Sequence, residues 1–318
     1  MSQVRPTIIA IISLLLLCVS SVTLAGPLKV GISLVDLSNP FFAILAEQIS
    51  RELKENHPDE MEILMHSSAY NLERQIAQLD DFIEKQVDMI FVAASETEAI
   101  APFVQRARAR GIIVVAVDIE STGADIIVTS NNVQAGSLAC HYLAQHIHQR
   151  GKVAIINGQH ISSTVNRVDG CKEAFNNYPG ITLVSDSHNS SGTYNGGLES
   201  MTYLMIEYPD IRGIFAINDP AALGAVEATE QLGRQDIDIV AVDASPEFLS
   251  QLNQKGTNFI ASTAQFPTKM AKRAVELALL QLKNKNSEQK VELIETELVT
   301  KDNASSYSNW QPVDNIQK

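Results

Sequence analysis

Polar side chains stand directly after several apolar segments of this chain that are typical of β-strands. They are Asp118 after IIVVAV, Asn218 and Asp219 after GIFAI, Asp243 after IVAV, and Gln265 after FIASTA. Arg167 is predicted to lie in the loop between the strand VAIIN and the following helix. In an open α/β sheet the carboxyl ends of the strands face the ligand crevice, so we expect these side chains to converge.

The chemistry of this set points to hydroxyl groups. Carboxylates and amides form paired hydrogen bonds with vicinal hydroxyls, and an arginine donates to a ring oxygen and a hydroxyl together. An anionic ligand would need more cations than Arg167 alone. The set therefore predicts a neutral polyhydroxylated ligand.

Several of these residues also have a purely structural alternative. Asp219 precedes a proline and is explained as a helix N-cap. Asp243 suits the chemistry of a turn, and Arg167 has a surface partner available in Asp169. Asp118 follows a fully apolar strand, and helix capping explains it poorly.

The stretch KVGISLVDLSNPFF supplies the aromatic part of the predicted site. A strand over Lys29–Val35 gives way to a helix at Asn39-Pro40, because asparagine is a good N-cap and proline suits the first helical turn. Asn39 and Phe41 stand at the strand's carboxyl edge, where a ligand is expected. For Phe42 a core role and a ligand role stay equally open. The helix is predicted to bury one face, comprising Phe42, Leu45, Ile49 and Leu53.

Alternating strands and helices predict an α/β fold of two doubly wound parallel-sheet lobes, with a boundary near Ser130-Asn131. The continuously apolar strand at 112–117 is typical of a sheet covered on both faces. The other predicted strands are 62–65, 88–93, 125–131, 152–156, 181–185, 213–217, 237–242 and 259–264. The helices between them are centred on 72–83, 100–107, 133–148, 170–178, 194–208 and 220–232.

The C-terminal part is predicted to cross between the lobes. A helix from Pro267 to about Lys283 would return to the first lobe, and one final strand, Val291–Leu298, would cross back. The helix is expected to bury one face, comprising Met270, Ala274, Leu277 and Leu280. We therefore assign 28–130 plus 265–290 to the N-terminal lobe, and 131–264 plus 291–318 to the C-terminal lobe and final crossover. Three crossings form a hinge, with the ligand in the cleft between the lobes.

The N-terminus predicts export. Arg5 precedes an apolar run, and Thr23-Leu24-Ala25 resembles a signal-peptidase site, so residues 1–25 are expected to be a cleaved signal peptide. A retained anchor is the alternative. Export to the periplasm places Cys140 and Cys171 in an oxidising compartment, where either a disulfide or two isolated buried thiols fits the sequence.

Charge and motifs exclude several function classes. The formal charge of −13 over 318 residues argues against nucleic acid or an anionic membrane as a partner. The sequence contains no GxGxxG, GxSxG, CxxC, HExxH or DxDxDG motif. His141, His146 and His148 share a predicted helix without zinc-ligand spacing. We expect no enzyme activity, no metal and no cofactor.

An ordered set of motifs resembles the periplasmic ribose-binding protein family, the sugar-binding components of ABC importers. The motifs are SNPFF, AVD at 116–118, NRVDG at 166–170, INDPAALGA at 217–225, VAVDASPE at 240–247, ASTAQFP at 261–267 and TKDN at 300–303. The resemblance implies the type 1 periplasmic binding protein fold with three crossovers. It also implies a ligand set that comprises Asn39, Phe41, Phe42, Asp118, Arg167, Asn218, Asp243 and Gln265.

Two departures from the family pattern bear on the ligand. Ribose binders carry an arginine where this chain has Ile119, and an aromatic residue near Gly192, with Tyr194 close by as a substitute. Glu120 adds an acid next to this position. Ile119, Glu120 and Tyr194 are therefore secondary candidates. The two departures argue against ribose itself, and the expected ligand is a sugar or polyol whose identity stays open.

The expected partners follow from the resemblance. The ligand-bound form is expected to dock, as a monomer, on an ABC transporter permease. The alternative is a chemoreceptor or sensor histidine kinase that reads the same closed form.

Overall fold

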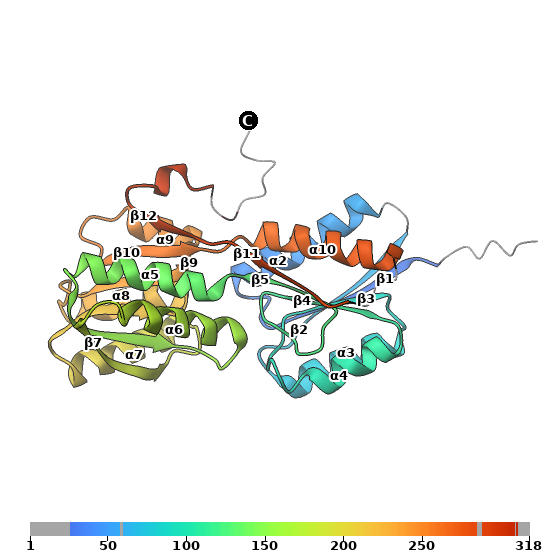
Figure 1. The fold of residues 1–318 in the computed structure, drawn as a ribbon, viewed down its shortest axis with the longest axis horizontal. Helices are drawn as coiled ribbons and strands as arrows, with labels where there is room; N and C mark the ends of the chain where they lie inside the picture. The colour runs from blue at the N-terminus through green and yellow to red at the C-terminus, as the bar shows by residue number, and fades with distance from the viewer. Residues whose placement is uncertain (1–25, 58–59, 285–287, 309, 311–318) are drawn as a thin grey trace, which may run out of the picture.

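The chain forms two six-stranded sheets, one in each lobe, and each is flanked by helices (Figure 1). The structure is a computed structural model that describes residues 26–57, 60–284, 288–308 and 310. The predicted signal peptide, 1–25, lies outside the described residues. Within them, no helix is both long and apolar enough to cross a membrane.

The N-terminal sheet has the strand order β11-β5-β4-β3-β1-β2, and all its strands are parallel. Its elements are β1 (Leu28–Leu34), α2 (Pro40–Asn56), β2 (Met61–Ser67), α3 (Leu72–Glu84), β3 (Met89–Val92), α4 (Ala101–Ala109), β4 (Ile113–Val117), β5 (Ile126–Ser130) and β11 (Lys290–Ile294). The helix α10 (Pro267–Asn284) packs on α2 and on β4 and β5.

The C-terminal sheet has the order β12-β10-β9-β8-β6-β7, with β12 antiparallel to β10. Its elements are α5 (Asn132–His146), β6 (Arg150–Asn157), α6 (Ser162–Phe175), β7 (Gly180–Asn189), α7 (Tyr194–Glu207), β8 (Ile211–Ala216), α8 (Asp219–Gln231), β9 (Asp238–Asp243), α9 (Pro246–Leu252), β10 (Phe259–Ala264) and β12 (Glu297–Thr300). The 3₁₀ turn η1 (Ala304–Ser306) follows.

The predicted fold of two doubly wound lobes and three crossovers is confirmed. The chain crosses from β5 to α5, from β10 to α10, and from β11 to β12. The short helix α9 was not predicted. Its sequence signal is Ser245, whose hydroxyl accepts from the Phe248 N–H at 3.1 Å, followed by a proline in the first turn.

The prediction of a single final strand over Val291–Leu298 was wrong. Residues 290–294 pair with β5 in the first sheet, so 291–294 belong there and not to the second lobe. The chain then changes sheets at Thr296, whose N–H and Oγ1 both donate to Oε1 of Gln134, at 2.9 and 2.8 Å. Thr296 therefore has hydrogen-bond partners at the point where it pairs with neither sheet. The predicted strand is divided there into β11 and β12.

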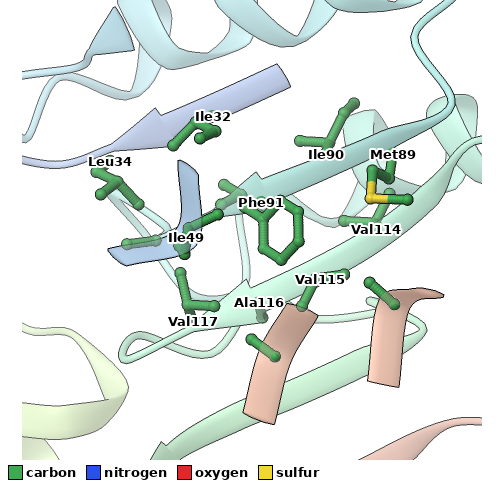
Figure 2. Packing of buried hydrophobic residues seen from close by; sticks show 14 of the residues in the cluster. Ile32, Leu34, Ile49, Met89, Ile90, Phe91, Val114, Val115, Ala116 and Val117 are labelled. Carbon is green, nitrogen blue, oxygen red and sulfur yellow. The ribbon is translucent and has the colours of Figure 1, made fainter. Parts of the chain in front are cut away.

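The apolar strands β3 and β4 form the centre of the first core, as the run at 112–117 predicts (Figure 2). Ile49 reaches this core from α2, together with the predicted Phe42, Leu45 and Leu53. On α10 the predicted apolar face is correct except at Leu280, which is 46% exposed. Ala278 and Gln281 take the buried positions near the end of that helix.

The helices α5 and α6 approach each other unusually closely. A Cβ on Gly136 would lie 1.9 Å from the Arg167 carbonyl oxygen, and one on Gly170 would lie 2.0 Å from that of Val133. Cys140 and Cys171, both fully buried, join the same two helices in a disulfide with Cα atoms 5.1 Å apart. This rigid helix pair carries Arg167.

The disulfide is predicted to stabilise the protein mainly by restricting the unfolded chain. Because it closes a loop with a sequence separation of 31, replacing both cysteines by serine should lower the free energy of unfolding by roughly 2–4 kcal/mol. Urea unfolding followed by circular dichroism measures this loss. Reductant should weaken the wild-type protein and leave the double variant unchanged, and equal stability of the two proteins without reductant would contradict the prediction.

Candidate ligand-binding cleft

All eight residues of the main predicted set line one cleft between the two lobes. The lining comprises Asn39, Phe41, Phe42, Tyr70, Asp118, Gln159, Ile161, Ser163, Thr164, Arg167, Ile217, Asn218, Asp243 and Gln265. The carboxyl ends of β1, β4, β8, β9 and β10 bring the predicted side chains there from both sheets. The convergence expected from the strand ends is therefore present.

The first helix presents its aromatic residues as the sequence predicts. Asn39 is the N-cap of α2, and its Oδ1 accepts from the Phe41 N–H at 3.0 Å. The Phe41 and Phe42 rings meet edge to face, with centroids 5.3 Å apart. Both rings are nearly buried and line the cleft, so Phe42 serves the core and the cleft wall together.

Hydrogen bonds between the backbone groups of Asp118 and residues of β5 hold Asp118 in the cleft wall. Its N–H donates to the Val128 carbonyl at 3.0 Å, and its carbonyl accepts from the Thr129 hydroxyl at 2.6 Å. The residue has φ of 63°, a conformation that Asp tolerates better than most residues. Its Oδ1 is buried and has no hydrogen-bond partner within the described chain.

Burial raises the pKa of the Asp118 carboxyl to about 6, against the lowering effect of the Arg167 charge, and the charge of Asp243 raises it further. A buried carboxylate oxygen without a partner is energetically unfavourable in the protein alone. It is a strong acceptor for a hydroxyl donor placed in the cleft.

Arg167 lies in the second turn of α6 and not in a loop, so that part of the prediction was wrong. The helix begins at Ser162, several residues earlier than the apolar pattern suggested. Nε donates to Oδ1 of Asn132 at 2.8 Å, and one terminal nitrogen donates to the Ile217 carbonyl at 2.8 Å. The same nitrogen lies 3.9 Å from Asp243 Oδ1, so the partner is Asp243 and not the surface residue Asp169.

Asp243 connects the cleft to the hinge. Its Oδ1 accepts from the Gln265 amide at 2.7 Å, and the Gln265 Oε1 accepts from the Ser130 hydroxyl at 2.8 Å. Gln265 and Ser130 stand at two different crossings between the lobes. Burial raises the pKa of Asp243 to about 6, opposed by the charge of Arg167 and the Gln265 hydrogen bond.

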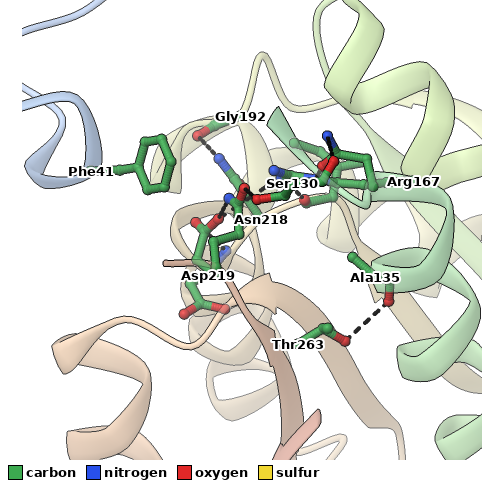
Figure 3. Close-up of polar contacts among 12 residues, drawn as sticks. Phe41, Ser130, Ala135, Arg167, Gly192, Asn218, Asp219 and Thr263 are labelled. Atoms are coloured by element: carbon green, nitrogen blue, oxygen red, sulfur yellow. Dashed lines mark hydrogen bonds and ion pairs between the residues drawn. The ribbon is translucent and has the colours of Figure 1, made fainter. Parts of the chain in front are cut away.

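Asn218, and not Asp219, caps α8. Its Oδ1 accepts from the Ala221 N–H at 3.1 Å, and its amide nitrogen donates to the Gly192 carbonyl at 3.0 Å (Figure 3). The N-cap role considered for Asp219 was wrong. Its fully buried carboxyl accepts from the Ser262 hydroxyl and from the Ser245 N–H, and burial holds its pKa well above the usual range.

The secondary candidates do not enter the cleft. Ile119 is fully buried in the first core, and Tyr194 is 43% exposed outside the cleft lining. Glu120 lies at the rim, in a neighbouring depression that also includes His160. Gly192 lies beside the cleft residue Asn218 through the hydrogen bond just described.

Sequence reasoning missed several lining residues. Tyr70 follows β2 in a turn with φ of 54°, and extending the rule of polar residues after strands to β2 would have found it. Burial raises the pKa of Tyr70, with further contributions from Asp118 and Asp36. Ile161, Ser163 and Thr164 were hidden because α6 begins earlier than predicted.

The two lobes touch at the rim of the cleft. The Ser162 N–H donates to the Thr97 hydroxyl at 3.1 Å, and its hydroxyl accepts from the Glu120 N–H at 2.9 Å. Ile161, from the second lobe, packs into the hydrophobic core of the first. The arrangement is therefore a closed one. Within the described residues, no group of three or more His, Cys, Asp or Glu side chains could hold a metal ion.

Comparisons with known proteins agree with this geometry. Residues 30–286 match a family model described as a periplasmic binding protein domain. The chain is 30% identical over 253 residues to a ribose import binding protein of Bacillus subtilis, which covers 78% of this chain and 80% of that protein. It is 28% identical to a D-ribose/D-allose-binding protein of Pseudomonas aeruginosa, over 88% of this chain and 92% of the relative.

A solved structure has the same fold. An ABC transporter periplasmic solute-binding protein of Actinobacillus succinogenes with bound D-allose superposes with a TM-score of 0.80 at 25% identity. The superposition covers 88% of this chain and all of that one.

The raised pKa of Asp118 leads to a prediction about stability. A folded-state pKa of about 6 against an ordinary value of 3.8 means that the folded protein binds the proton more tightly, so stability falls as the pH rises from about 4 to about 6. Asp118→Asn removes the buried charge. It should raise the free energy of unfolding of the ligand-free protein at pH 7.5 by roughly 1–3 kcal/mol, with no gain near pH 4.

Urea unfolding at both pH values measures this difference. Asp302→Asn is the control, because that side chain is exposed and should show no pH-dependent gain. A loss of stability in Asp118→Asn at pH 7.5 would show that the carboxylate supports the fold.

Proposed function

The chain belongs to the periplasmic binding protein family, and we propose that it captures a sugar or polyol between its lobes and delivers it to an ABC importer. The observation that supports this proposal is the cleft, where eight predicted residues from both lobes meet. Two of the eight supply carboxylates and one supplies a guanidinium. The family consists of substrate-binding proteins and not of enzymes.

Each side chain has a definite role in this proposal. Asp118 and Asp243 accept hydrogen bonds from vicinal hydroxyls, and Arg167 donates to the ligand from a position fixed by Asn132 and Ile217. Asn39, Asn218 and Gln265 add side-chain amide groups to the cleft lining. Phe41 and Phe42 cover the C–H surface of the ligand.

The charge balance of the cleft selects a neutral ligand. Asp118 and Asp243, with pKa values of about 6, are mostly ionised at neutral pH and outnumber the single guanidinium of Arg167. An anionic ligand would meet net repulsion in a buried site, where charges interact strongly. Hydroxyl groups relieve the unpaired carboxylate oxygen without adding charge.

Ligand binding is coupled to lobe closure. A ligand that contacts both lobes binds the closed arrangement better than the open one and shifts the population toward it. The closed form would then present a combined surface of both lobes to the permease. The names of the relatives as import proteins favour transport over the alternative, presentation to a chemoreceptor or sensor histidine kinase. We propose that the protein acts as a monomer.

The ligand class is broader than ribose. Ile119 stands where ribose binders carry a guanidinium, and its side chain is buried away from the cleft. Gly192 brings no ring to its position beside Asn218. Tyr70 adds a phenol to the cleft lining. We therefore propose a test panel of D-ribose, D-allose, xylitol and myo-inositol.

Isothermal titration with this panel tests the proposal. At least one member should bind with micromolar or tighter affinity. At a hundredfold excess over its dissociation constant it should raise the free energy of unfolding by about 2.7 kcal/mol. No binding by any member would contradict the proposal.

A matched pair of variants on β9 makes this test specific. Asp243→Asn removes a carboxylate at the cleft end of the strand and should weaken binding at least tenfold, because a charge-assisted hydrogen bond is lost. Asp238→Asn changes the same residue type at the other end, where Asp238 pairs with His146, and should leave affinity unchanged. Equal losses in both variants would contradict the assigned site.

Export also has a direct test. We propose a periplasmic location, with residues 1–25 removed as a signal peptide. Mass spectrometry of the protein recovered from the periplasm of an expressing Gram-negative host should give an N-terminus at Gly26. An intact N-terminus, or retention in the membrane fraction, would indicate the anchor alternative.

A further inference from the structure

The chain beyond β12 returns to the boundary between the lobes. The Thr300 N–H donates to Oδ1 of Asn303 at 2.8 Å and fixes the turn into η1. Tyr307 follows and is buried in the core of the second lobe, its ring 6.3 Å from that of Phe266. Three positions later, Trp310 is buried in the core of the first lobe, with 5% of its surface exposed.

Trp310 contacts one cleft residue from each lobe. Its ring meets Phe41 edge to face, with centroids 5.6 Å apart and an interplanar angle of 75°. Its indole N–H donates to the Asp243 carbonyl at 3.1 Å. Phe41 belongs to the first turn of α2 and Asp243 ends β9, so the two contacts join a cleft residue of one lobe to a cleft residue of the other.

Asp243, which accepts the hydrogen bond from Trp310, has a constrained backbone. Asp243 has φ of 137°, a backbone conformation that a side chain disfavours. Its carbonyl accepts from the Gln265 N–H at 3.1 Å as well as from Trp310. These two donors, one from the cleft residue Gln265 and one from Trp310, hold the Asp243 peptide and therefore its carboxylate in place.

We propose that Trp310 is a positioning residue that ties Phe41 to Asp243 and slows release of the bound sugar or polyol. The inference rests on the proposed function. Trp310 lies beyond residues 30–286, the part that matches the family model. Contacts that join the lobes favour the closed arrangement, and release requires opening, so their loss speeds dissociation.

Stopped-flow dissociation of the tightest-binding panel member tests the proposal. Trp310→Ala should raise the dissociation rate roughly tenfold, because it removes an aromatic pair and a hydrogen bond. Trp310→Phe keeps a ring without the N–H donor and should fall between Trp310→Ala and the wild type. The association rate should stay within about twofold, since Trp310 does not itself line the cleft that the ligand enters.

Leu252→Ala is the control for a purely structural effect. Leu252 is buried in the second lobe on α9, outside the cleft, so its truncation lowers the free energy of unfolding without touching either contact of Trp310. Its dissociation rate should equal that of the wild type. If Leu252→Ala and Trp310→Ala speed dissociation equally, Trp310 has only a structural role and the proposal is overturned.

A second measurement does not need a sugar. Spin labels on cysteines introduced at the exposed Glu73 of α3 and Glu199 of α7 report the distance between the lobes. In the ligand-free protein, Trp310→Ala should lengthen and broaden this distance distribution. An unchanged distribution overturns the proposal. A wild-type protein that binds no panel member refutes the proposed function, while the distance still decides the role of Trp310.

Discussion

Burial of two carboxylates and one guanidinium in one cleft is the constraint around which the rest of the structure is arranged. Burial raises the pKa values of Asp118 and Asp243 to about 6, and the charge of Arg167 opposes this rise in both. An unpaired buried acceptor such as Asp118 Oδ1 destabilises the protein alone and favours a ligand that donates a hydrogen bond. The site is therefore unfavourable for folding for the same reason that it is favourable for binding hydroxyl groups.

The scaffold compensates for this unfavourable burial by fixing the Arg167 guanidinium on a closely packed pair of helices. Gly136 and Gly170 let α5 and α6 touch main chain to main chain, and the disulfide between Cys140 and Cys171 joins the same helices. Asn132, in the first turn of α5, then receives the hydrogen bond from Arg167 Nε. The cation is placed by rigid packing before any ligand arrives, which lowers the entropy lost on binding.

The hinge and the site share side chains. Ser130 stands at the first crossing and Gln265 at the second, and their hydrogen bond continues to the Asp243 carboxylate. Movement of one lobe relative to the other must therefore disturb a cleft residue directly. This coupling through contact is a physical basis for a ligand-dependent change in lobe position.

Much of the fold was predictable because its signals are local. The Asn39-Pro40 start of α2, the apolar strand at 112–117 and the alternation of elements follow from capping, periodicity and strand composition. The division of Val291–Leu298 into two strands was not, because a strand's sequence does not say which of two sheets will pair with it. Tyr70 was missed for a different reason, because it stands in a turn after β2 and the rule of polar residues after strands was not extended to that strand.

What the sequence by itself determined was the architecture and the ring of residues at the strand ends, from Asn39 to Gln265. Chain direction alone brings the carboxyl ends of parallel strands to one edge. Only the tertiary structure decided which of two neighbouring polar residues does which task, as with Asn218 capping α8 while Asp219 is buried against Ser262. It also decided that Trp310 bridges Phe41 and Asp243, a contact between residues far apart in the chain. Such contacts depend on how two lobes pack, and no periodicity or spacing encodes that packing.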